Sequence, residues 1–265
     1  MASRANQAAY DALATIDYVV GAPHLRHESI RRLYLDLLGT ALGPFLSRGR
    51  CPRVLDLGAG EGSATLPLLQ MGAAVVAVDI SARQLAALQA RCAGFADRLT
   101  MRCEDISTVL AEDREEYDAV VANSLLHHIP DYLNLVEGVA RIVREGGAFV
   151  SFQDPVWRPA MSRRDRWLSD GAYAIWRLGR GDVIGGLGRR LRRMRGRYSE
   201  SSIHDNVEFH AVRQGVDQHA IVRLLNERGF RCRLQEYCSF HSDYLQRFGE
   251  RWRVLNTFGL LAVRE

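Results

Sequence analysis

Short apolar runs alternate with helical patterns through much of the chain. The runs occupy residues 53–57, 74–79, 99–103, 118–122 and 147–153. Because their apolarity is continuous, they are typical of strands that are covered on both faces. Strands that alternate with helices are joined by right-handed crossovers and pair in parallel. The alternation therefore predicts an α/β fold built on a doubly wound parallel sheet.

Capping residues mark where the intervening helices begin and end. Ser81 and Gln84 have the spacing of a capping box, which predicts a helix from residue 82 onward. Asp131 is expected to begin another helix, and Gly146 with Gly147 is expected to end it.

The C-terminal part of the chain departs from this alternation. Asp217 to Arg228 has helical periodicity, and Gly229 is its expected terminator. Residues 230–240 and 253–263 then read as two strands joined by a polar loop, too close together for a helical crossover, so they should pair antiparallel. The predicted architecture is a Rossmann-like doubly wound sheet, mostly parallel, with an antiparallel C-terminal strand pair and a helical cap.

Two segments lie outside this predicted core. We expect a single domain over residues 1–265, with a core at about 35–154 and 213–265 and a cap formed by residues 1–34 and an insertion at 155–212. The insertion is far longer than an ordinary connection between elements. It follows a strand at the carboxyl edge of the sheet, where ligands bind in such folds, so we expect it to cover the substrate.

Composition excludes several classes of protein. No apolar run reaches the roughly 18 residues of a membrane span, and the N-terminal residues lack the apolar core of a signal peptide. The five cysteines are scattered, which favours reduced thiols over a disulfide framework. We therefore expect a cytoplasmic protein without stable membrane insertion.

A glycine-rich turn follows the first predicted strand. Residues 53–62 read Arg-Val-Leu-Asp-Leu-Gly-Ala-Gly-Glu-Gly, so that Gly58, Gly60 and Gly62 let the backbone turn tightly against a flat ligand. Asp79 ends the second strand, where a carboxylate can accept from both ribose hydroxyls. Asp105 follows the third strand and could accept from an adenine amino group. Such a turn occurs in dinucleotide folds and in S-adenosylmethionine (SAM) enzymes, but the glycine spacing suits a nicotinamide cofactor less well.

This set of motifs resembles the class I SAM-dependent methyltransferases. The resemblance covers residues 53–153 well, the C-terminal strands by their layout, and the two cap segments hardly at all. It implies SAM as cofactor and S-adenosyl-L-homocysteine (SAH) as product. The residues that it assigns to the cofactor are Asp56, Gly58, Ala59, Gly60, Asp79, Ile80, Glu104, Asp105, Ile106, Asn123 and Ser124.

A Leu-His-His-Ile-Pro-Asp segment follows the fourth strand at residues 126–131. Many small-molecule members of the family carry a Leu-His-His-x-Pro-Asp loop at this place, beside the transferable methyl group. The resemblance therefore makes His127 and His128 the candidate catalytic residues, with His127 as first choice. Imidazole suits proton abstraction at neutral pH. Because the two histidines are adjacent and no Cys or carboxylate cluster supports them, we expect no metal.

The acceptor is expected to be a small molecule methylated on oxygen, nitrogen or activated carbon, and to be a specialised metabolite. Eight arginines between residues 177 and 197 suggest either a solvated helix or an anionic or carrier-tethered substrate. Base-modifying relatives often carry an Asn/Asp-Pro-Pro-aromatic motif where this chain has Asn-Ser-Leu-Leu, and the net charge is only +4, so we expect no nucleic-acid partner. The alternatives are a SAM-binding protein that does not methylate and a nicotinamide oxidoreductase. Weaker substrate candidates are Tyr10, Tyr18, Trp157, His204 and His210.

Overall fold

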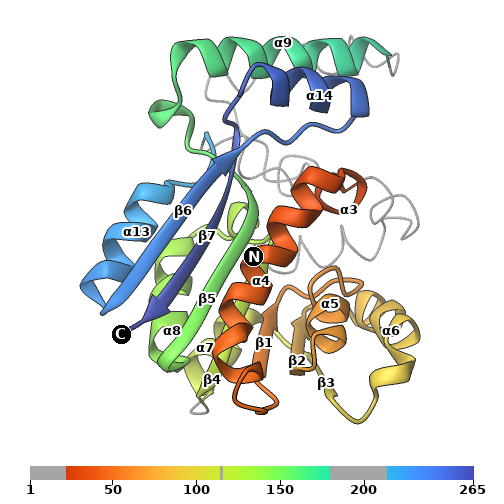
Figure 1. Cartoon of the computed structure of the whole chain (residues 1–265), viewed down its shortest axis with the longest axis vertical. Helices are drawn as coiled ribbons and strands as arrows, with labels where there is room; N and C mark the ends of the chain where they lie inside the picture. Colours follow the sequence, from red (N-terminus) through yellow and green to blue (C-terminus); the bar gives the residue numbers. More distant parts are fainter. Residues whose placement is uncertain (1–21, 114–115, 180–213) are drawn as a thin grey trace.

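A seven-stranded sheet forms the centre of the computed structural model, which describes residues 22–113, 116–179 and 214–265. The strands stand in the order β3-β2-β1-β4-β5-β7-β6 (Figure 1). Neighbours are parallel from β3 through β5, and β7 is antiparallel to both β5 and β6. The predicted fold class is confirmed. The strands are β1 (Arg53–Leu57), β2 (Ala74–Asp79), β3 (Leu99–Cys103), β4 (Tyr117–Asn123), β5 (Val143–Pro155), β6 (Phe230–Tyr237) and β7 (Thr257–Arg264).

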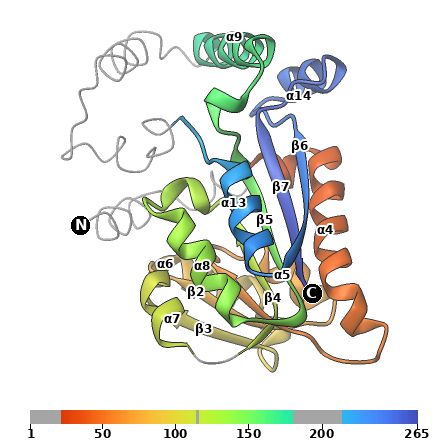
Figure 2. The ribbon, with the colours of Figure 1, turned by 90° about the vertical axis from the view of Figure 1, so that its left-hand side faces the viewer.

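Helices cover both faces of this sheet (Figure 2). One layer contains α4 (Glu28–Leu46), α5 (Thr65–Gln70) and α6 (Ala82–Arg91), which share a core with the strands. The other layer contains α7 (Ile106–Glu112), α8 (Tyr132–Ile142) and α13 (Gln218–Glu227). Neighbouring strand residues such as Val120 and Val121 are therefore both fully buried, one in each core. This two-sided burial explains the continuous apolar runs in the sequence.

Short polar side chains begin the helices as predicted. Ser81 Oγ accepts the backbone N–H of Gln84 (3.3 Å) at the start of α6. Asp131 Oδ1 accepts the backbone N–H of Asn134 (3.2 Å) at the start of α8. Asp217 does the same for two amides of α13. These hydrogen bonds satisfy N–H groups that the first turn of a helix leaves without partners.

Several sequence-based predictions of where elements begin and end are wrong; β5 begins four residues earlier than expected, and β7 begins four residues later. Helix α8 ends at Ile142, and Gly146 (φ +71°) lies inside β5 rather than ending the helix. The polar loop expected between the last two strands contains a helix, α14 (Asp243–Arg251), which Ser242 caps. The proposed boundary between residues 34 and 35 falls in the middle of α4, where Tyr34 is fully buried against the sheet.

A second, smaller cluster lies at the carboxyl edge of the sheet. After β5 the chain forms a short 3₁₀ turn (Arg158–Ala160) and then α9 (Arg163–Gly179), which lies beside α14 (Figure 1). Ala172 of α9 packs with Phe240, Leu245 and Val254 in this cluster. Further 3₁₀ turns span Ala93–Phe95 and Leu126–His128, and a short helix α3 (Pro23–Arg26) precedes α4. Among the described helices, none is both long enough and apolar enough to cross a bilayer.

Candidate functional site

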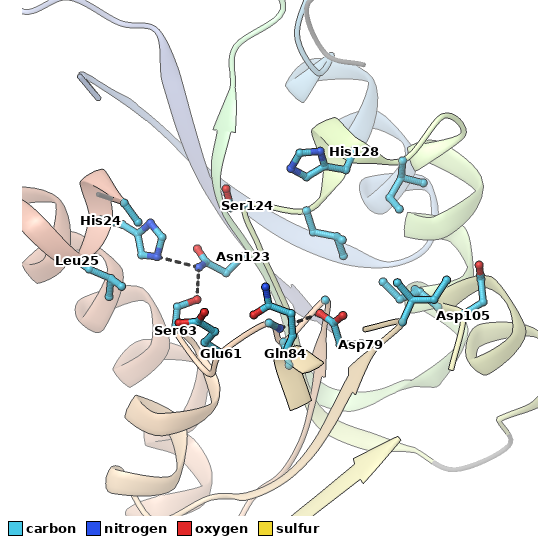
Figure 3. A pocket seen from close by; sticks show the side chains of 18 residues that line it. His24, Leu25, Glu61, Ser63, Asp79, Gln84, Asp105, Asn123, Ser124 and His128 are labelled. Atoms are coloured by element: carbon cyan, nitrogen blue, oxygen red, sulfur yellow. Dashed lines mark hydrogen bonds between the residues drawn. The ribbon is translucent and has the colours of Figure 1, made fainter. Parts of the chain in front are cut away.

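A cavity opens at the carboxyl edge of the parallel strands, beside β1, β2 and β4 (Figure 3). Its volume is about 1030 Å³ when the space open to solvent is included. Five segments line it: residues 22–25 before and within α3, the glycine turn, the end of β2 with the start of α6, the end of β3, and the loop after β4. The cavity therefore lies at the switch point of the sheet, where such folds bind their ligands.

The glycine turn forms the floor of the cavity. Gly58 has φ +68° and Gly60 has φ +52°, which residues with a side chain rarely adopt. A Cβ atom on Gly58 would lie 2.8 Å from Leu125 Cδ1. Glycine at both positions therefore avoids backbone strain, and at position 58 it also avoids a clash with Leu125.

Asp79 connects this turn to the end of β2. Its Oδ2 accepts the backbone N–H of Gly60 (2.8 Å), and its Oδ1 accepts the backbone N–H of Ser81 (2.8 Å). Both donors are fixed by backbone, so the carboxylate is held in one orientation at the cavity wall (Figure 3). A carboxylate in this position suits a ligand that carries hydroxyl donors.

A polar cluster forms the opposite wall. Asn123 Nδ2 donates to His24 Nε2 (3.1 Å) and to Ser63 Oγ (3.0 Å) (Figure 3). Burial lowers the pKa of His24 to about 4, so the imidazole is neutral at physiological pH. Since Nε2 accepts a hydrogen bond, its proton is on Nδ1. His24 Nδ1 and Asn123 Oδ1 are both buried, and neither has a hydrogen-bond partner among the described residues.

The two histidines after β4 have different surroundings. His128 lines the cavity, whereas His127 does not. The backbone N–H and Nδ1–H of His127 both donate to Asp154 Oδ1, at 3.1 and 2.8 Å. The two imidazole rings lie 3.9 Å apart between centroids. His127 is thus held from behind by a carboxylate and packs against the ring that faces the cavity.

Asp154 reaches His127 because of a bulge in β5. Phe152 pairs with Gly259 and Asp154 pairs with Phe258, so Gln153 is an extra residue without a partner on β7. Gln153 has φ +65°. In a regular strand Asp154 would share a face with Phe152, but the bulge moves it to the face of Ser151, whose hydroxyl donates to Asp154 Oδ2 (3.0 Å). The carboxyl group is fully buried, and burial raises its pKa to about 7.

Most of the residues predicted for the cofactor line this cavity. The lining includes Gly58, Ala59, Gly60, Asp79, Ile80, Asp105, Ile106, Asn123 and Ser124. Asp105 also begins α7, because its Oδ1 accepts the backbone N–H of Ser107 (2.8 Å).

Three predicted residues lie elsewhere. Asp56 is buried beneath the turn and accepts the hydroxyl of Thr65; burial, with the nearby Asp79 charge, raises its pKa to about 7. Glu104 forms a two-point ion pair with Arg102 (3.0 and 2.8 Å) instead of facing the cavity. Trp157 lies after β5, where its backbone N–H donates to Gln218 (3.2 Å), and it does not contribute to the lining.

The remaining substrate predictions are not tested by the structure. Tyr10, Tyr18, His204 and His210, together with the arginine-rich stretch beyond residue 179, lie outside the described residues. The described part of the insertion, including α9, contributes nothing to the cavity lining. The expected covering of the site by residues 155–212 stays a prediction, because much of that segment lies outside the described residues.

Sequence reasoning missed several lining residues. Glu61 and Ser63 continue the glycine turn, and Gln84 follows Asp79 by about one helical turn, so local spacing could have found them. His24 gave no such signal, because only the packing of α3 and α4 brings it to Asn123. The other missed residues are Ala22, Leu25, Leu125 and Ile129. In the described parts of the chain, no group of three or more His, Cys, Asp or Glu side chains could hold a metal ion.

Comparison with protein families finds one matching model. Residues 55–151 match the family described as "Methyltransferase domain". Similar curated proteins include the ubiquinone biosynthesis O-methyltransferases of Paracidovorax citrulli, 33% identical over 97 residues, and of Xylella fastidiosa, 31% identical over 100 residues. These matches cover 36% and 37% of this chain, and 40% and 41% of the relatives. The likeness therefore spans about two fifths of each relative.

Solved structures match over nearly the whole chain at low identity. Magnesium protoporphyrin IX methyltransferase (ChlM) from Synechocystis PCC 6803 with bound SAM has a TM-score of 0.56 at 16% identity and covers 100% of this chain and 98% of its own. N-methyltransferase NodS from Bradyrhizobium japonicum WM9 with SAH has a TM-score of 0.55 at 15% identity, covering 97% and 96%. The [4+2]-cyclase SpnF has a TM-score of 0.60 at 13% identity, covering 100% and 97%. At these identities the likeness shows a shared fold.

Proposed function

We propose that this chain, whose residues 55–151 match a methyltransferase domain, is a class I SAM-dependent methyltransferase that transfers a methyl group from SAM to a small-molecule acceptor. The single observation that carries this proposal is the connection between Asp79 and the Gly60 amide (2.8 Å) at the cavity wall. It places a fixed carboxylate, which can accept from ribose hydroxyls, beside a glycine turn whose backbone is open to the methionine part of SAM.

The polar wall of the cavity fits the rest of SAM. Neutral His24 offers a buried N–H donor, and Asn123 offers a buried acceptor, without partners in the described residues. Such groups are costly unless something hydrogen-bonds to them. A ligand that carries both a carboxylate and an ammonium group would satisfy both. SAM has these groups, and when bound it supplies an electrophilic methyl group on a sulfonium centre.

We assign the role of base, or of acceptor-orienting group, to His128. It lines the cavity, whereas the proton on His127 Nδ1 is directed to Asp154. Methyl transfer is an in-line displacement, so most of the rate gain comes from holding nucleophile and methyl group about 3–3.5 Å apart. A base adds to this when the acceptor loses a proton near the transition state. In this proposal His127 and Asp154 are positioning residues that hold the His128 ring.

The proposal for the acceptor names the atom that is methylated and the chemical class of the molecule. Oxygen is the acceptor atom to test first, because the matched curated relatives are named O-methyltransferases. The match lies in the segment that we assign to the cofactor, so it does not bear on the acceptor. Nitrogen and activated carbon therefore remain in the proposal. We also propose that the acceptor is a specialised metabolite and that the enzyme works in the cytoplasm. The seven arginines between residues 180 and 197 favour an acceptor that is anionic or tethered to a carrier.

Two experiments test the proposal in sequence. Calorimetry with SAH, and separately with NAD, should show binding of SAH alone. Methyl-labelled SAM with a panel of phenols, amines and activated carbon acids should then give a labelled product. Binding of NAD without SAH would refute the cofactor assignment. Binding of SAH without label transfer to any acceptor would instead favour a protein that does not methylate. This alternative is worth testing because SpnF, which has a similar fold, is named a [4+2]-cyclase.

A further inference from the structure

Exposed hydrophobic side chains are concentrated in one part of the described structure. Every large hydrophobic residue that is exposed there lies between residues 167 and 178 or between 244 and 255. The exposed fraction is 76% for Trp167 and 79% for Tyr244. The complete set is Trp167, Tyr173, Ile175, Leu178, Tyr244, Trp252 and Leu255. Single exposed apolar residues need no explanation, but a contiguous group of them does.

Helix α9 is apolar on two adjacent sides. Its inner side packs Leu168, Ala172 and Trp176 against the cluster that contains α14. Trp167, Ile175 and Leu178 follow one another at spacings of eight and three residues, so they share a second side of the helix, roughly 100° around from the buried one, and are exposed. A helix that only needed to cover the protein would have a polar outer side.

Helix α14 continues this surface. Leu245, Gln246 and Gly249 are its buried residues, whereas Tyr244 and Trp252 are exposed. The side chain of Arg164 in α9 donates to the backbone carbonyl of Trp252. The two helices also lie side by side in both views (Figures 1 and 2). We call Trp167, Ile175, Leu178, Tyr244 and Trp252 the outer face.

Positive charge surrounds the outer face. The exposed arginines of the two helices and the turn after them are Arg163, Arg164, Arg247, Arg251 and Arg253. Two of the four acids on these helices are neutralised by ion pairs, Asp170 with Arg158 (3.0 Å) and Asp243 with Arg26 (3.0 Å). Asp165 is buried, and the exposed Glu250 accepts hydrogen bonds from Ser29 and Gln246.

We propose that the outer face docks on an anionic membrane surface. Tryptophan and tyrosine have an apolar ring and a polar edge, which suits the boundary between lipid headgroups and acyl chains. Arginine beside them can bind lipid phosphates while its stem covers apolar surface. A symmetric pairing of two copies would instead bring like charges together. This proposal does not depend on the proposed function.

The docking surface and the cavity lie on the same side of the molecule. Strand β6 is parallel to β5, because both are antiparallel to β7. α9 follows the end of β5 and α14 follows the end of β6, so both helices lie at the carboxyl edge, where the cavity opens (Figure 1). Docking would therefore turn this edge of the sheet toward the bilayer.

Vesicle sedimentation tests the proposal with the full chain. We expect the wild-type protein to bind phosphatidylcholine vesicles containing 30 mol% phosphatidylglycerol, and to bind pure phosphatidylcholine vesicles at least about tenfold more weakly. Trp167→Ala with Trp252→Ala should weaken binding to the anionic vesicles by about 100-fold, roughly tenfold for each tryptophan. Arg163→Glu with Arg251→Glu should weaken it at least as much, and raising the salt concentration should weaken the wild type.

A matched control uses arginines away from the outer face. Arg31 on α4 and Arg223 on α13 are also exposed, so Arg31→Glu with Arg223→Glu makes the same change in net charge. We expect this variant to bind nearly as well as the wild type. Equal losses in the two charge variants, or no wild-type binding at millimolar lipid, would overturn the proposal. A wild-type dimer in sedimentation velocity that becomes monomeric in the tryptophan variant would also overturn it, by assigning the face to a second copy.

Discussion

The contact between Gly58 and Leu125 allows a stability test of the glycine turn. Alanine at position 58 must adopt φ +68°, and its Cβ would lie 2.8 Å from Leu125 Cδ1. Alanine at position 60 must adopt φ +52°, but nothing lies within 4 Å of its Cβ. The two substitutions therefore share the backbone cost and differ in the steric one.

These two costs can be given magnitudes. The left-handed conformation costs a residue with a side chain about 1–2 kcal/mol. Leu125 is buried in the core, so moving its Cδ1 methyl out of contact forces a strained rotamer, at about 0.5–1.5 kcal/mol. We expect Gly60→Ala to lower the free energy of unfolding by about 1–2 kcal/mol and Gly58→Ala by about 1.5–3.5 kcal/mol.

A double-mutant cycle isolates the steric part. Leu125→Val removes the methyl that the new Cβ would meet, so Gly58→Ala should cost about 0.5–1.5 kcal/mol less in that background. Gly60→Ala with Leu125→Val should be additive. Urea unfolding followed by circular dichroism measures all variants at one pH. If Gly58→Ala and Leu125→Val prove additive within about 0.3 kcal/mol, the close contact does not exist and the reasoning fails.

Three further predictions concern the histidines, a buried acid and α14. His128→Ala should lower turnover by about 100-fold with SAH affinity nearly unchanged, and His127→Ala should lower turnover by a smaller factor. Unchanged turnover in both variants, with SAH binding as in the wild type, would show that neither histidine acts as a base. Burial raises the pKa of Asp56 from 3.8 to about 7, so the folded state keeps a proton that the unfolded chain releases between pH 4 and 7. The free energy of unfolding should therefore fall as pH rises through that window, by up to about 4 kcal/mol from this group, and Asp56→Asn should remove that part of the fall in urea unfolding at pH 5 and pH 8. Gly249→Ala should loosen α14, because its Cβ would lie 2.1 Å from Cys238 Sγ; proteolysis should cut first within residues 238–256, and an unchanged cleavage pattern would contradict this.

Local patterns were sufficient to find the ends of three of the parallel strands. β1, β2 and β3 begin and end at the predicted residues, because continuous apolarity reflects burial between two helical layers. Helix α14 was missed for a corresponding reason. Most of its nine residues are polar or charged, and its buried side contains Gln246 and Gly249 beside Leu245, so its apolar content is that of a polar loop.

The candidate site also contains residues that the sequence predicts and an arrangement that it does not. Gly58, Asp79 and Asn123 lie at strand ends, so a correct strand assignment brings them to one edge of the sheet. The order of the two histidines could not be predicted. It depends on Asp154, which reaches His127 only through the bulge at Gln153, and nothing in the sequence marks that extra residue.

The position of α4 has a consequence for synthesis on the ribosome. This helix precedes all the strands in the sequence, yet its Leu37 and Leu42 share a core with Phe152 of β5 and Leu261 of β7. In a nascent chain, the part of the apolar side of α4 that packs on β7 therefore stays uncovered until β7 has emerged from the exit tunnel. During that interval the helix is a natural binding segment for chaperones, and the early half of the polypeptide waits for its final strand before it can close.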